Sequence, residues 1–523
     1  MLTKVKSAAN TGLEMTGIDV EVNVASRGLP GFDIVGLPDK AVGESRERVK
    51  TAINSSKIEF PNKKITVNLA PADIPKEGSC YDLPIAVGII CAEIGCQIPG
   101  KSLFFGELSL DGSLRHTKGT FLLALFAKEH NYENIFVPKD SAAEASIIQG
   151  INVYPVENLK QLIRHFSGEA IVAEARHPQA AEDGPPQAEF DMAEILGQEQ
   201  AKRAMEIAAG GGHNILMIGS PGTGKTMLAR ALPGILPQLS EEESLEATKI
   251  YSAAGQIPPG SSLIRVPPFR SPHHTASAAG LIGGGARPLP GEISLAHRGV
   301  LFLDEFNEFP RHVLEALRQP LEDGYLTIAR AKERVKYPAR FMLVASCNPC
   351  PCGYLNHPKK KCICSWRAIQ KYRKRVSGPI LDRIDIHVDV PPVDLKELSE
   401  NQKASEFLEP SEAIRARVLR ARQIQHQRFL GDPDFIEGPR QSRGKIFTNA
   451  EMQNPHIKKY CKLEKAVEQI LQQASSKFQL SARAYLKMIK VARTIADLEE
   501  VPEIKVNHVA EALQYRQKSN EEI

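Results

Sequence analysis

One glycine-rich stretch most restricts what this chain folds into. The stretch directly follows the apolar residues 215–218 and fits the pattern G-x-x-x-x-G-K-[ST]. Its residues are Gly219, Ser220, Pro221, Gly222, Thr223, Gly224, Lys225 and Thr226. By average residue usage the pattern is expected about 0.02 times in a chain of this length. A loop with little side-chain bulk lets backbone N–H groups approach a triphosphate closely. The stretch therefore predicts a phosphate-binding P-loop between a strand and a helix, rather than a glycine-rich turn of no function.

The P-loop assigns a role to each of its last two residues, and a second motif complements them. Lys225 is expected beside the β- and γ-phosphates of ATP, and the Thr226 hydroxyl on Mg²⁺. Downstream, the apolar residues 300–303 end in Asp304 and Glu305. A strand that ends in two carboxylates is a Walker B candidate, in which Asp304 holds Mg²⁺ through water and Glu305 orients and polarises the attacking water.

Length and composition set the broad class. A chain of 523 residues is long enough for about three domains. Its 42% hydrophobic and 24% charged residues are typical of soluble globular proteins, and the net charge of +4 says little about partners. We predict a cytoplasmic protein without membrane contact, since neither a signal peptide nor a long apolar run is evident. The nine cysteines favour reduced thiols or a metal site over a disulfide framework.

Composition shifts and periodicity divide the chain. Alternating apolar residues, such as Ile18, Val20, Val22 and Val24, predict half-buried strands, and residues 39–55 predict a helix between strands. Residues 168–189 are rich in Ala, Glu, Gln and Pro, which is typical of a linker. We predict an α+β domain over 1–168, a linker over 169–189, a nucleotide-binding core over 190–395 and a helical lid over 396–523.

The first domain resembles the proteolytic domain of the Lon family. The resemblance rests on the segment Lys76-Glu77-Gly78-Ser79-Cys80-Tyr81-Asp82 and on the strand and turn at residues 106–112. It places Cys80 where that family has its nucleophilic serine and Phe121 where it has the basic lysine. Because a nucleophile needs an adjacent base or a lowered pKa, we expect this domain to serve assembly or partner binding rather than peptide hydrolysis.

The order of the remaining motifs resembles the AAA+ ATPases. Asn348 follows a further apolar strand, Arg383 lies in the segment Leu381-Asp382-Arg383-Ile384-Asp385, and Arg483 opens a late helix. The resemblance implies a sensor-1 role for Asn348 at the γ-phosphate. It implies that Arg383 is the arginine finger reaching a neighbouring subunit's γ-phosphate and that Arg483 is the sensor-2 arginine of the lid. Taken singly, each arginine is more often an ordinary surface ion-pair partner.

Further motifs narrow the resemblance to the magnesium-chelatase branch. They are residues 269–275 (FRSPHHT), residues 281–285 (LIGGG) and residues 290–297 (PGEISLAH). Together with the Lon-like domain, the whole chain resembles the ComM/YifB family. That family implies an α/β AAA+ core with a helical lid, and a hexameric, ATP-driven ring that moves on DNA and drives branch migration in homologous recombination and natural transformation. The alternatives are a chelatase-like ATPase that remodels a protein partner and, less well supported, an ATP-dependent protease. We expect His273 and His274 to form a polar turn anchored by Pro272 rather than to bind a metal, because the side chains of two adjacent histidines usually point apart.

A cysteine cluster within 347–366 predicts a structural zinc site. Two close pairs flank a short loop, and their four thiolates suit tetrahedral Zn²⁺: Cys350, Cys352, Cys362 and Cys364. Their spacing is tighter than usual, so Cys347 or His357 is an alternative ligand, and free reduced cysteines remain a further interpretation. With all four positions filled by protein, such a metal stabilises the insertion rather than catalyses.

Basic residues interleaved with aromatic ones predict contact with DNA. No acidic residue occurs over 354–381, a segment that holds Trp366, Tyr372 and the cations Lys359, Lys360, Lys361, Arg367, Lys371 and Arg373. Unbalanced cations repel one another unless a polyanion is present, although a charge run is often only a solvated surface. Arg330, Lys332, Arg334 and Lys336 recur at period two in an expected hairpin that would push on a strand. We expect single-stranded and branched DNA as partners.

Overall fold

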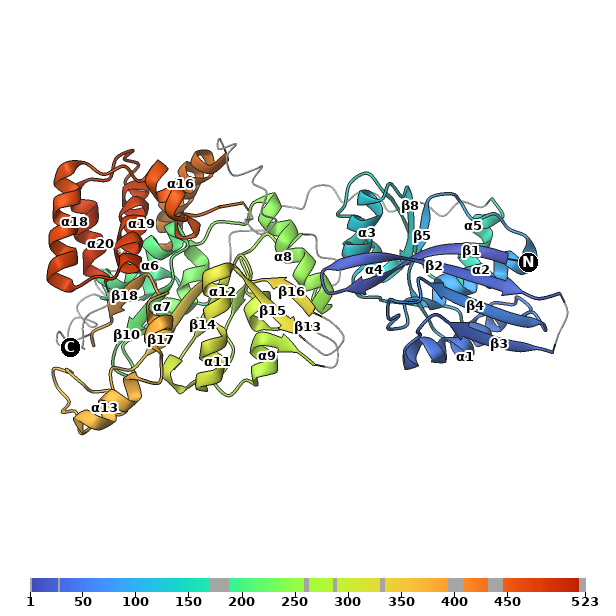
Figure 1. Cartoon of the computed structure of the whole chain (residues 1–523), viewed down its shortest axis with the longest axis horizontal. Helices are drawn as coiled ribbons and strands as arrows, with labels where there is room; N and C mark the ends of the chain where they lie inside the picture. The colour runs from blue at the N-terminus through green and yellow to red at the C-terminus, as the bar shows by residue number, and fades with distance from the viewer. Residues whose placement is uncertain are drawn as a thin grey trace.

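The structure is a computed structural model that describes residues 2–26, 29–168, 188–257, 263–285, 289–329, 334–393, 408–430 and 445–516. Its units lie in a row, with the N-terminal sheet at the right of Figure 1, the nucleotide-binding core in the middle and the C-terminal helices at the left. In the part of the chain described, no helix is both long and apolar enough to span a membrane. The predicted linker, residues 169–189, lies almost entirely outside the described residues.

The N-terminal unit is a seven-stranded sheet in the order β3-β4-β2-β1-β5-β8-β9. The alternating residues predicted to be half-buried are buried in β2, and Asp39 caps the predicted helix α1 by accepting a bond from the Val42 backbone N–H. The strands are β1 (Leu2–Thr11), β2 (Glu14–Val24), β3 (Gly31–Val35), β4 (Lys64–Ala70), β5 (Ser102–Phe104), β8 (Asn134–Pro138) and β9 (Asn152–Val156), with a small ladder of β6 (Glu107–Leu108) and β7 (Leu114–Arg115). The helices are α1 (Lys40–Ser55), α2 (Asp82–Ile94), α3 (Thr120–Glu129), α4 (Lys139–Ala145) and α5 (Leu159–Phe166).

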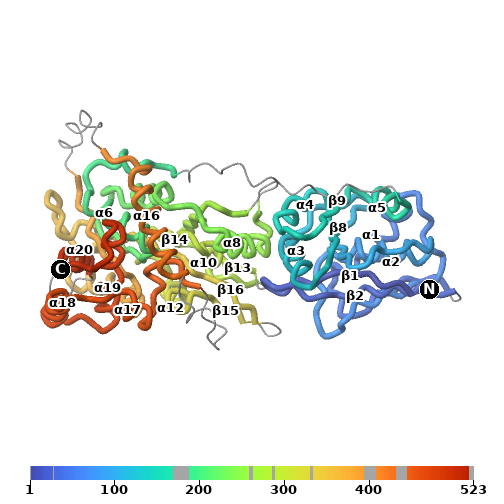
Figure 2. The backbone as a smooth tube through the Cα atoms, turned by 90° about the horizontal axis from the view of Figure 1, so that it is seen from above, coloured from blue at the N-terminus to red at the C-terminus, as the bar shows by residue number. Residues whose placement is uncertain are grey.

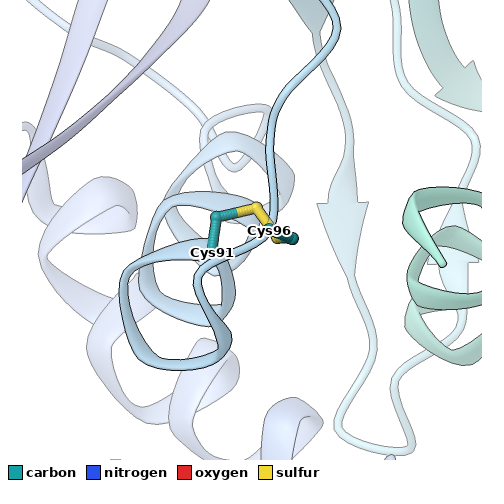
Figure 3. The surroundings of a disulfide bond; sticks show 2 residues. All are labelled: Cys91 and Cys96. Carbon is teal, nitrogen blue, oxygen red and sulfur yellow. A yellow bond between two sulfur atoms is a disulfide. The ribbon is translucent and has the colours of Figure 1, made fainter.

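One pair of cysteines in this unit contradicts the expectation of reduced thiols. Cys91 near the end of α2 and Cys96 just beyond it form a disulfide (Figure 3). The left-handed Gly95 that caps α2 turns the chain back, so the two Cα atoms lie 4.7 Å apart. The other seven cysteines are free, so the expectation fails for this pair alone, because the sequence does not show where helix α2 ends.

The core is a five-stranded parallel sheet in the order β11-β14-β17-β10-β18. Its strands are buried on both faces, because alternate residues of β10, β14 and β17 enter two different hydrophobic clusters. The strands are β10 (Ile215–Ile218), β11 (Phe269–Arg270), β14 (Val300–Leu303), β17 (Met342–Cys347) and β18 (Ile386–Asp389). The surrounding helices are α6 (Glu199–Gly211), α7 (Lys225–Ala231), α8 (Glu241–Ala254), α9 (Ala278–Ile282), α10 (Glu292–Leu295), α11 (Arg311–Ala316), α12 (Arg318–Asp323), α13 (Trp366–Arg373) and α14 (Gly378–Leu381).

Two antiparallel pairs stand apart from this sheet. β12 (Gly283–Gly284) pairs with β13 (Leu289–Pro290), and β15 (Tyr325–Ala329) pairs with β16 (Arg334–Pro338). The second pair is the hairpin predicted before the sensor-1 strand. Its predicted basic residues Arg330 and Lys332 lie outside the described residues, whereas Arg334 and Lys336 lie in β16.

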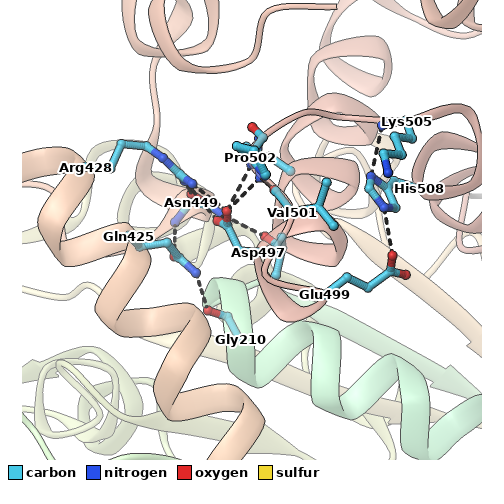
Figure 4. A network of polar contacts seen from close by, with 12 residues as sticks. Gly210, Gln425, Arg428, Asn449, Asp497, Glu499, Val501, Pro502, Lys505 and His508 are labelled. Atoms are coloured by element: carbon cyan, nitrogen blue, oxygen red, sulfur yellow. Dashed lines mark hydrogen bonds and ion pairs between the residues drawn. The ribbon is translucent and has the colours of Figure 1, made fainter.

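The lid is a set of helices around a buried polar network (Figure 4). Asp497 is fully enclosed and accepts bonds from Arg428 (2.9 Å), Arg493 (3.1 Å) and Asn449 (2.8 Å), which joins three segments of the lid. Gln425 donates to the Gly210 carbonyl at 2.9 Å and so ties the lid to α6 of the core. The helices are α16 (Ser411–Leu430), α17 (Asn454–Tyr460), α18 (Lys465–Phe478), α19 (Ala482–Leu498) and α20 (Val506–Gln514). The predicted α/β AAA+ fold with a helical lid is confirmed.

The N-terminal unit contacts the core at two places, which Figures 1 and 2 show side by side from two directions. At the first, α8 lies against α3, Ala253 enters the apolar cluster of the N-terminal unit, and Ser252 hydrogen-bonds the buried Glu144 at 2.5 Å. At the second, the β1–β2 turn meets the β15–β16 hairpin. Leu13 packs on the hairpin, and an added Cβ at the left-handed Gly12 would lie 2.4 Å from Val335.

Candidate active site

The P-loop joins β10 to α7 at the carboxyl end of the parallel sheet. Gly222 and Gly224 have φ values of +78° and +88°, which favour glycine because other residues rarely adopt this conformation. At Gly219 an added Cβ would lie 2.4 Å from the Val390 carbonyl oxygen, so no side chain fits there. These features keep the loop narrow and leave the amino end of α7 facing its concave side.

Lys225 is held inside this loop. Its Nζ donates to the carbonyls of Gly219 (2.7 Å) and Ser220 (2.9 Å) and lies 3.4 Å from Oδ1 of Asn348. The side chain is 8% exposed, and burial lowers the pKa of its ammonium group. The structure thus brings the predicted sensor-1 residue Asn348, at the end of β17, next to the predicted phosphate-binding lysine.

The two predicted Mg²⁺ residues also meet. The Thr226 hydroxyl donates to Oδ2 of Asp304 at 2.8 Å, and the Ser346 hydroxyl donates to the other carboxylate oxygen. Asp304 directly follows β14, Ser346 lies near the end of the adjacent β17, and Thr226 lies in the first turn of α7, which the P-loop connects to β10. Hydroxyl and carboxylate oxygens are the ligands that Mg²⁺ prefers, so this oxygen pair fits the ion. Ser346 was missed, although its position at a strand end beside Asn348 was a usable signal.

Glu305 lies at the edge of the same site with an unusual backbone and an unexpected partner. Its φ is +51°, a left-handed conformation that is costly for a residue other than glycine. The carboxylate lies 3.1 Å from Nδ1 of His274. The interpretation of His273 and His274 as rings that point apart is wrong, because their centroids lie 4.1 Å apart. No local signal in the sequence pairs His274 with a carboxylate on a distant strand.

The two predicted phosphate-sensing arginines lie elsewhere. β18 runs parallel to β10 with Ile386 opposite Ile215, and Asn214, which precedes β10, donates to the Arg383 carbonyl at 3.0 Å. Arg383 is therefore at the amino end of the sheet, whereas the P-loop is at the carboxyl end, roughly 13 Å further along a strand of this length. Arg483, at the start of α19, shares the carboxylate of Glu322 with Arg383. Neither arginine is beside the P-loop of its own chain.

The four predicted cysteines form one cluster next to the P-loop. The sulfur of each lies within 4.8 Å of the others, and Cys350 lies 3.4 Å from Cys352 and 3.7 Å from Cys362. Tetrahedral ligation with metal–sulfur bonds of about 2.3 Å places sulfurs about 3.8 Å apart, so the cluster is compatible with a metal site of four thiolates. The alternative ligand Cys347 lies outside it, and burial raises the pKa of its thiol to about 12.

The predicted DNA-binding residues form two separate surfaces rather than one. Helix α13 and the loop before it project at one side of the core, and the β15–β16 hairpin faces the N-terminal unit at the other (Figure 1). On the first surface Trp366 is 54% exposed. The other exposed members there are Lys359, Lys360, Lys361, Arg367 and Lys371, with Arg373 half-buried. On the second, Arg334 and Lys336 are exposed while Val335 and Tyr337 point inward.

The Lon-like segment shows no lysine at the base position. Phe121 is completely buried in the apolar core of the N-terminal unit. Lys76 is buried and donates to the Pro71 carbonyl, and Ser79 donates to Glu107. These contacts agree with a structural use of the segment.

Comparisons with known proteins identify the family. The family model described as magnesium chelatase, subunit ChlI, matches residues 191–398, and two further ChlI models match residues 20–141 and 408–516. The chain is 41% identical over 521 residues to competence protein ComM of Haemophilus influenzae, covering 98% of this chain and 97% of the relative. The chain belongs to the ComM/YifB family. It is also 40% identical to the uncharacterized protein YifB of Escherichia coli over the same length.

Membership of the ComM/YifB family supports ATP and Mg²⁺ as ligands and ATP hydrolysis as an activity. A more distant relative is the magnesium-chelatase 38 kDa subunit of Cereibacter sphaeroides, 29% identical over 176 residues, which covers 31% of this chain and 53% of that protein. The shared ATPase architecture therefore extends beyond the ComM/YifB proteins.

Proposed function

We propose that the protein is an ATP-driven DNA motor that works as a hexameric ring and drives branch migration in homologous recombination and natural transformation. The observation that carries the proposal is the β15–β16 hairpin, which presents Arg334 and Lys336 on one exposed face. Exposed cations on a hairpin neutralise phosphates without reading sequence, as a motor that moves along DNA requires. The relation to a competence protein agrees with this role.

In this proposal the P-loop binds the triphosphate, and Lys225 exchanges its carbonyl partners for phosphate oxygens. Thr226 and Asp304 would hold Mg²⁺, which when bound would neutralise charge on the phosphates, and Asn348 would contact the γ-phosphate. Glu305 orients and polarises water once it leaves His274. Arg383 and Arg483 complete the site of a neighbouring subunit, a role that their position at the opposite end of the sheet supports.

The supporting parts also have proposed roles. We propose that Cys350, Cys352, Cys362 and Cys364 bind one structural Zn²⁺, which would hold the basic loop beside α13. We propose that residues 1–168 form a Lon-like domain without peptidase activity. The core over 190–395 and the lid over 396–523 then form the motor.

A second candidate is an ATPase that remodels a protein partner. The likeness to a magnesium-chelatase subunit favours it. An ATPase assay with four-way DNA, linear duplex or no DNA, combined with strand displacement at two salt concentrations, separates the two. The DNA motor requires stimulation that weakens steeply with salt. No stimulation and no displacement would favour the protein-remodelling role.

A further inference from the structure

One carboxylate joins the two arginines that were predicted separately. Glu322, in the last turn of α12, accepts from Nη2 of Arg483 at 2.7 Å through one oxygen and from Nη2 of Arg383 through the other. These two cations come from different parts of the fold, one from the end of the core sheet and one from the lid. A single acidic side chain therefore neutralises a pair of guanidinium groups that would otherwise repel each other.

Glu322 does not satisfy all the hydrogen-bond donors of these two arginines. Arg383 is the more restrained of the two, since its side chain is only 9% exposed and its Nη1 donates to the Pro379 carbonyl at 2.6 Å. Its Nε is buried and has no hydrogen-bond partner among the described residues. All three side chains line one cavity of about 680 Å³, which also contains Lys487 and Lys490. Carboxylates such as Asp382 and Glu451 also line this cavity, so its overall charge does not select an anion. The two adjacent guanidinium groups and the spare Nε donor of Arg383 are the features that suit a multivalent anion.

The anion cannot be the nucleotide of the same chain. The P-loop is at the other end of the parallel sheet, so a triphosphate bound there faces away from Arg383 and Arg483. In a ring, each subunit's cavity can instead meet the nucleotide of its neighbour.

We propose that Glu322 is a positioning residue whose carboxylate occupies the anion position between Arg383 and Arg483. When the ring forms, the γ-phosphate of a neighbouring subunit displaces this carboxylate. This inference rests on the proposed ring. Glu322 accepts two charge-assisted bonds with the spacing of a bidentate anion, and it remains 46% exposed, so solvent and a competing anion reach it. Only Asp323 and Gly324 separate Glu322 from β15, so the exchange occurs at the base of the hairpin.

The test is nucleotide-dependent assembly, measured by sedimentation of the full chain over a series of protein concentrations with a non-hydrolysable ATP analogue and Mg²⁺. Glu322→Gln keeps the shape of the side chain and removes the competing charge. We expect it to lower the protein concentration for half-assembly about threefold or more. Asp323→Asn is the matched control, because it removes a charge from the neighbouring exposed residue, and we expect no shift for it.

The arginines themselves decide whether Glu322 acts through them. In a chain that already carries Arg383→Ala and Arg483→Ala, Glu322→Gln should no longer shift assembly. The inference would be overturned if Glu322→Gln left the protein concentration for half-assembly unchanged or raised it. It would also be overturned if Glu322→Gln lowered this concentration equally in the chain that carries Arg383→Ala and Arg483→Ala. A wild-type chain that stays monomeric would overturn it together with the ring. If Glu322→Gln lowers the concentration for half-assembly as expected but no DNA raises the ATPase rate, the inference is supported. Only the proposal of a DNA motor is then contradicted.

Discussion

Lys225 and Glu305 differ in their surroundings, and the difference separates their roles. Lys225 is enclosed by P-loop carbonyls, whereas Glu305 is half-exposed beside His274. We expect Lys225→Ala to weaken ATP binding about tenfold or more, because it removes a charge-assisted contact to phosphate. Glu305→Gln should keep ATP affinity and lower turnover about 100-fold, because it removes only water activation. Equilibrium binding of a fluorescent ATP analogue, together with phosphate release, checks both. Equal ATP affinity in wild type and Lys225→Ala contradicts the assignment.

Arg383 is expected to act in the nucleotide site of a neighbouring subunit. Because it lies at the end of the sheet opposite the P-loop, Arg383→Ala should abolish hydrolysis while ATP affinity is largely kept. Mixing this variant with Lys225→Ala subunits should restore part of the activity, since each supplies what the other lacks. An unchanged turnover rate for Arg383→Ala removes the residue from the site.

Residues with local patterns could be predicted, and residues with distant partners could not. The spacing of Gly219 to Thr226 and the strand before Asp304 carry their chemistry in the sequence itself. His274 and Glu322 gain their roles only when the fold brings Glu305 and the two arginines to them. Single polar residues of this kind have no periodicity that separates them from an ordinary surface.

The insertion between β17 and α13 is an element that we expect to depend on metal. Purified protein should contain about one Zn²⁺ per chain, and Cys362→Ser combined with Cys364→Ser should lose it while ATP still binds. Elemental analysis and ATP binding check the two parts. Ser365→Ala, which removes a helix cap next to the cluster without removing a thiol, is the control and should retain the metal. A metal-free wild-type protein with full ATPase activity contradicts the zinc assignment.

The lid depends on its buried polar network. Asp497→Ala leaves Arg428 and Arg493 without their shared carboxylate, and we expect a loss of about 3–5 kcal/mol in the free energy of unfolding. Glu500→Ala is the control, because Glu500 pairs with Arg420 at an exposed site and should cost about 1 kcal/mol or less. Urea unfolding followed by circular dichroism measures both. Similar losses for the two variants would show that the network does not stabilise the lid.

Elements with clear periodicity were predictable, and contacts between elements were not. Alternation in β2 and the apolar stripe of α19 follow from burial on one face. The docking of the β1–β2 turn on the hairpin depends on Gly12 and Leu13, which the sequence marks only as a turn. The disulfide between Cys91 and Cys96 likewise depends on where α2 ends.

In the whole molecule, the N-terminal unit packs against the β15–β16 hairpin, which we propose contacts DNA. Leu13 packs on Ile328, Val335 and Tyr337 of the hairpin, and α8 carries a second contact to the same unit. The other basic surface, around α13, lies on the far side of the core (Figure 1). DNA that contacts both surfaces would have to pass along the core. The hairpin and α13 are therefore two separate contacts for DNA.

The central claim is that DNA contact at the hairpin drives the ATPase, and one assay tests it most directly. ATP hydrolysis is measured with and without four-way DNA for wild type, for Arg334→Glu with Lys336→Glu, and for Lys40→Glu with Lys160→Glu. The last pair makes the same charge change on exposed lysines of the N-terminal unit. We expect DNA to raise hydrolysis in wild type and in the Lys40 and Lys160 control, while the hairpin variant keeps basal hydrolysis and loses the stimulation. Equal stimulation of all three proteins, or of none, would contradict the account.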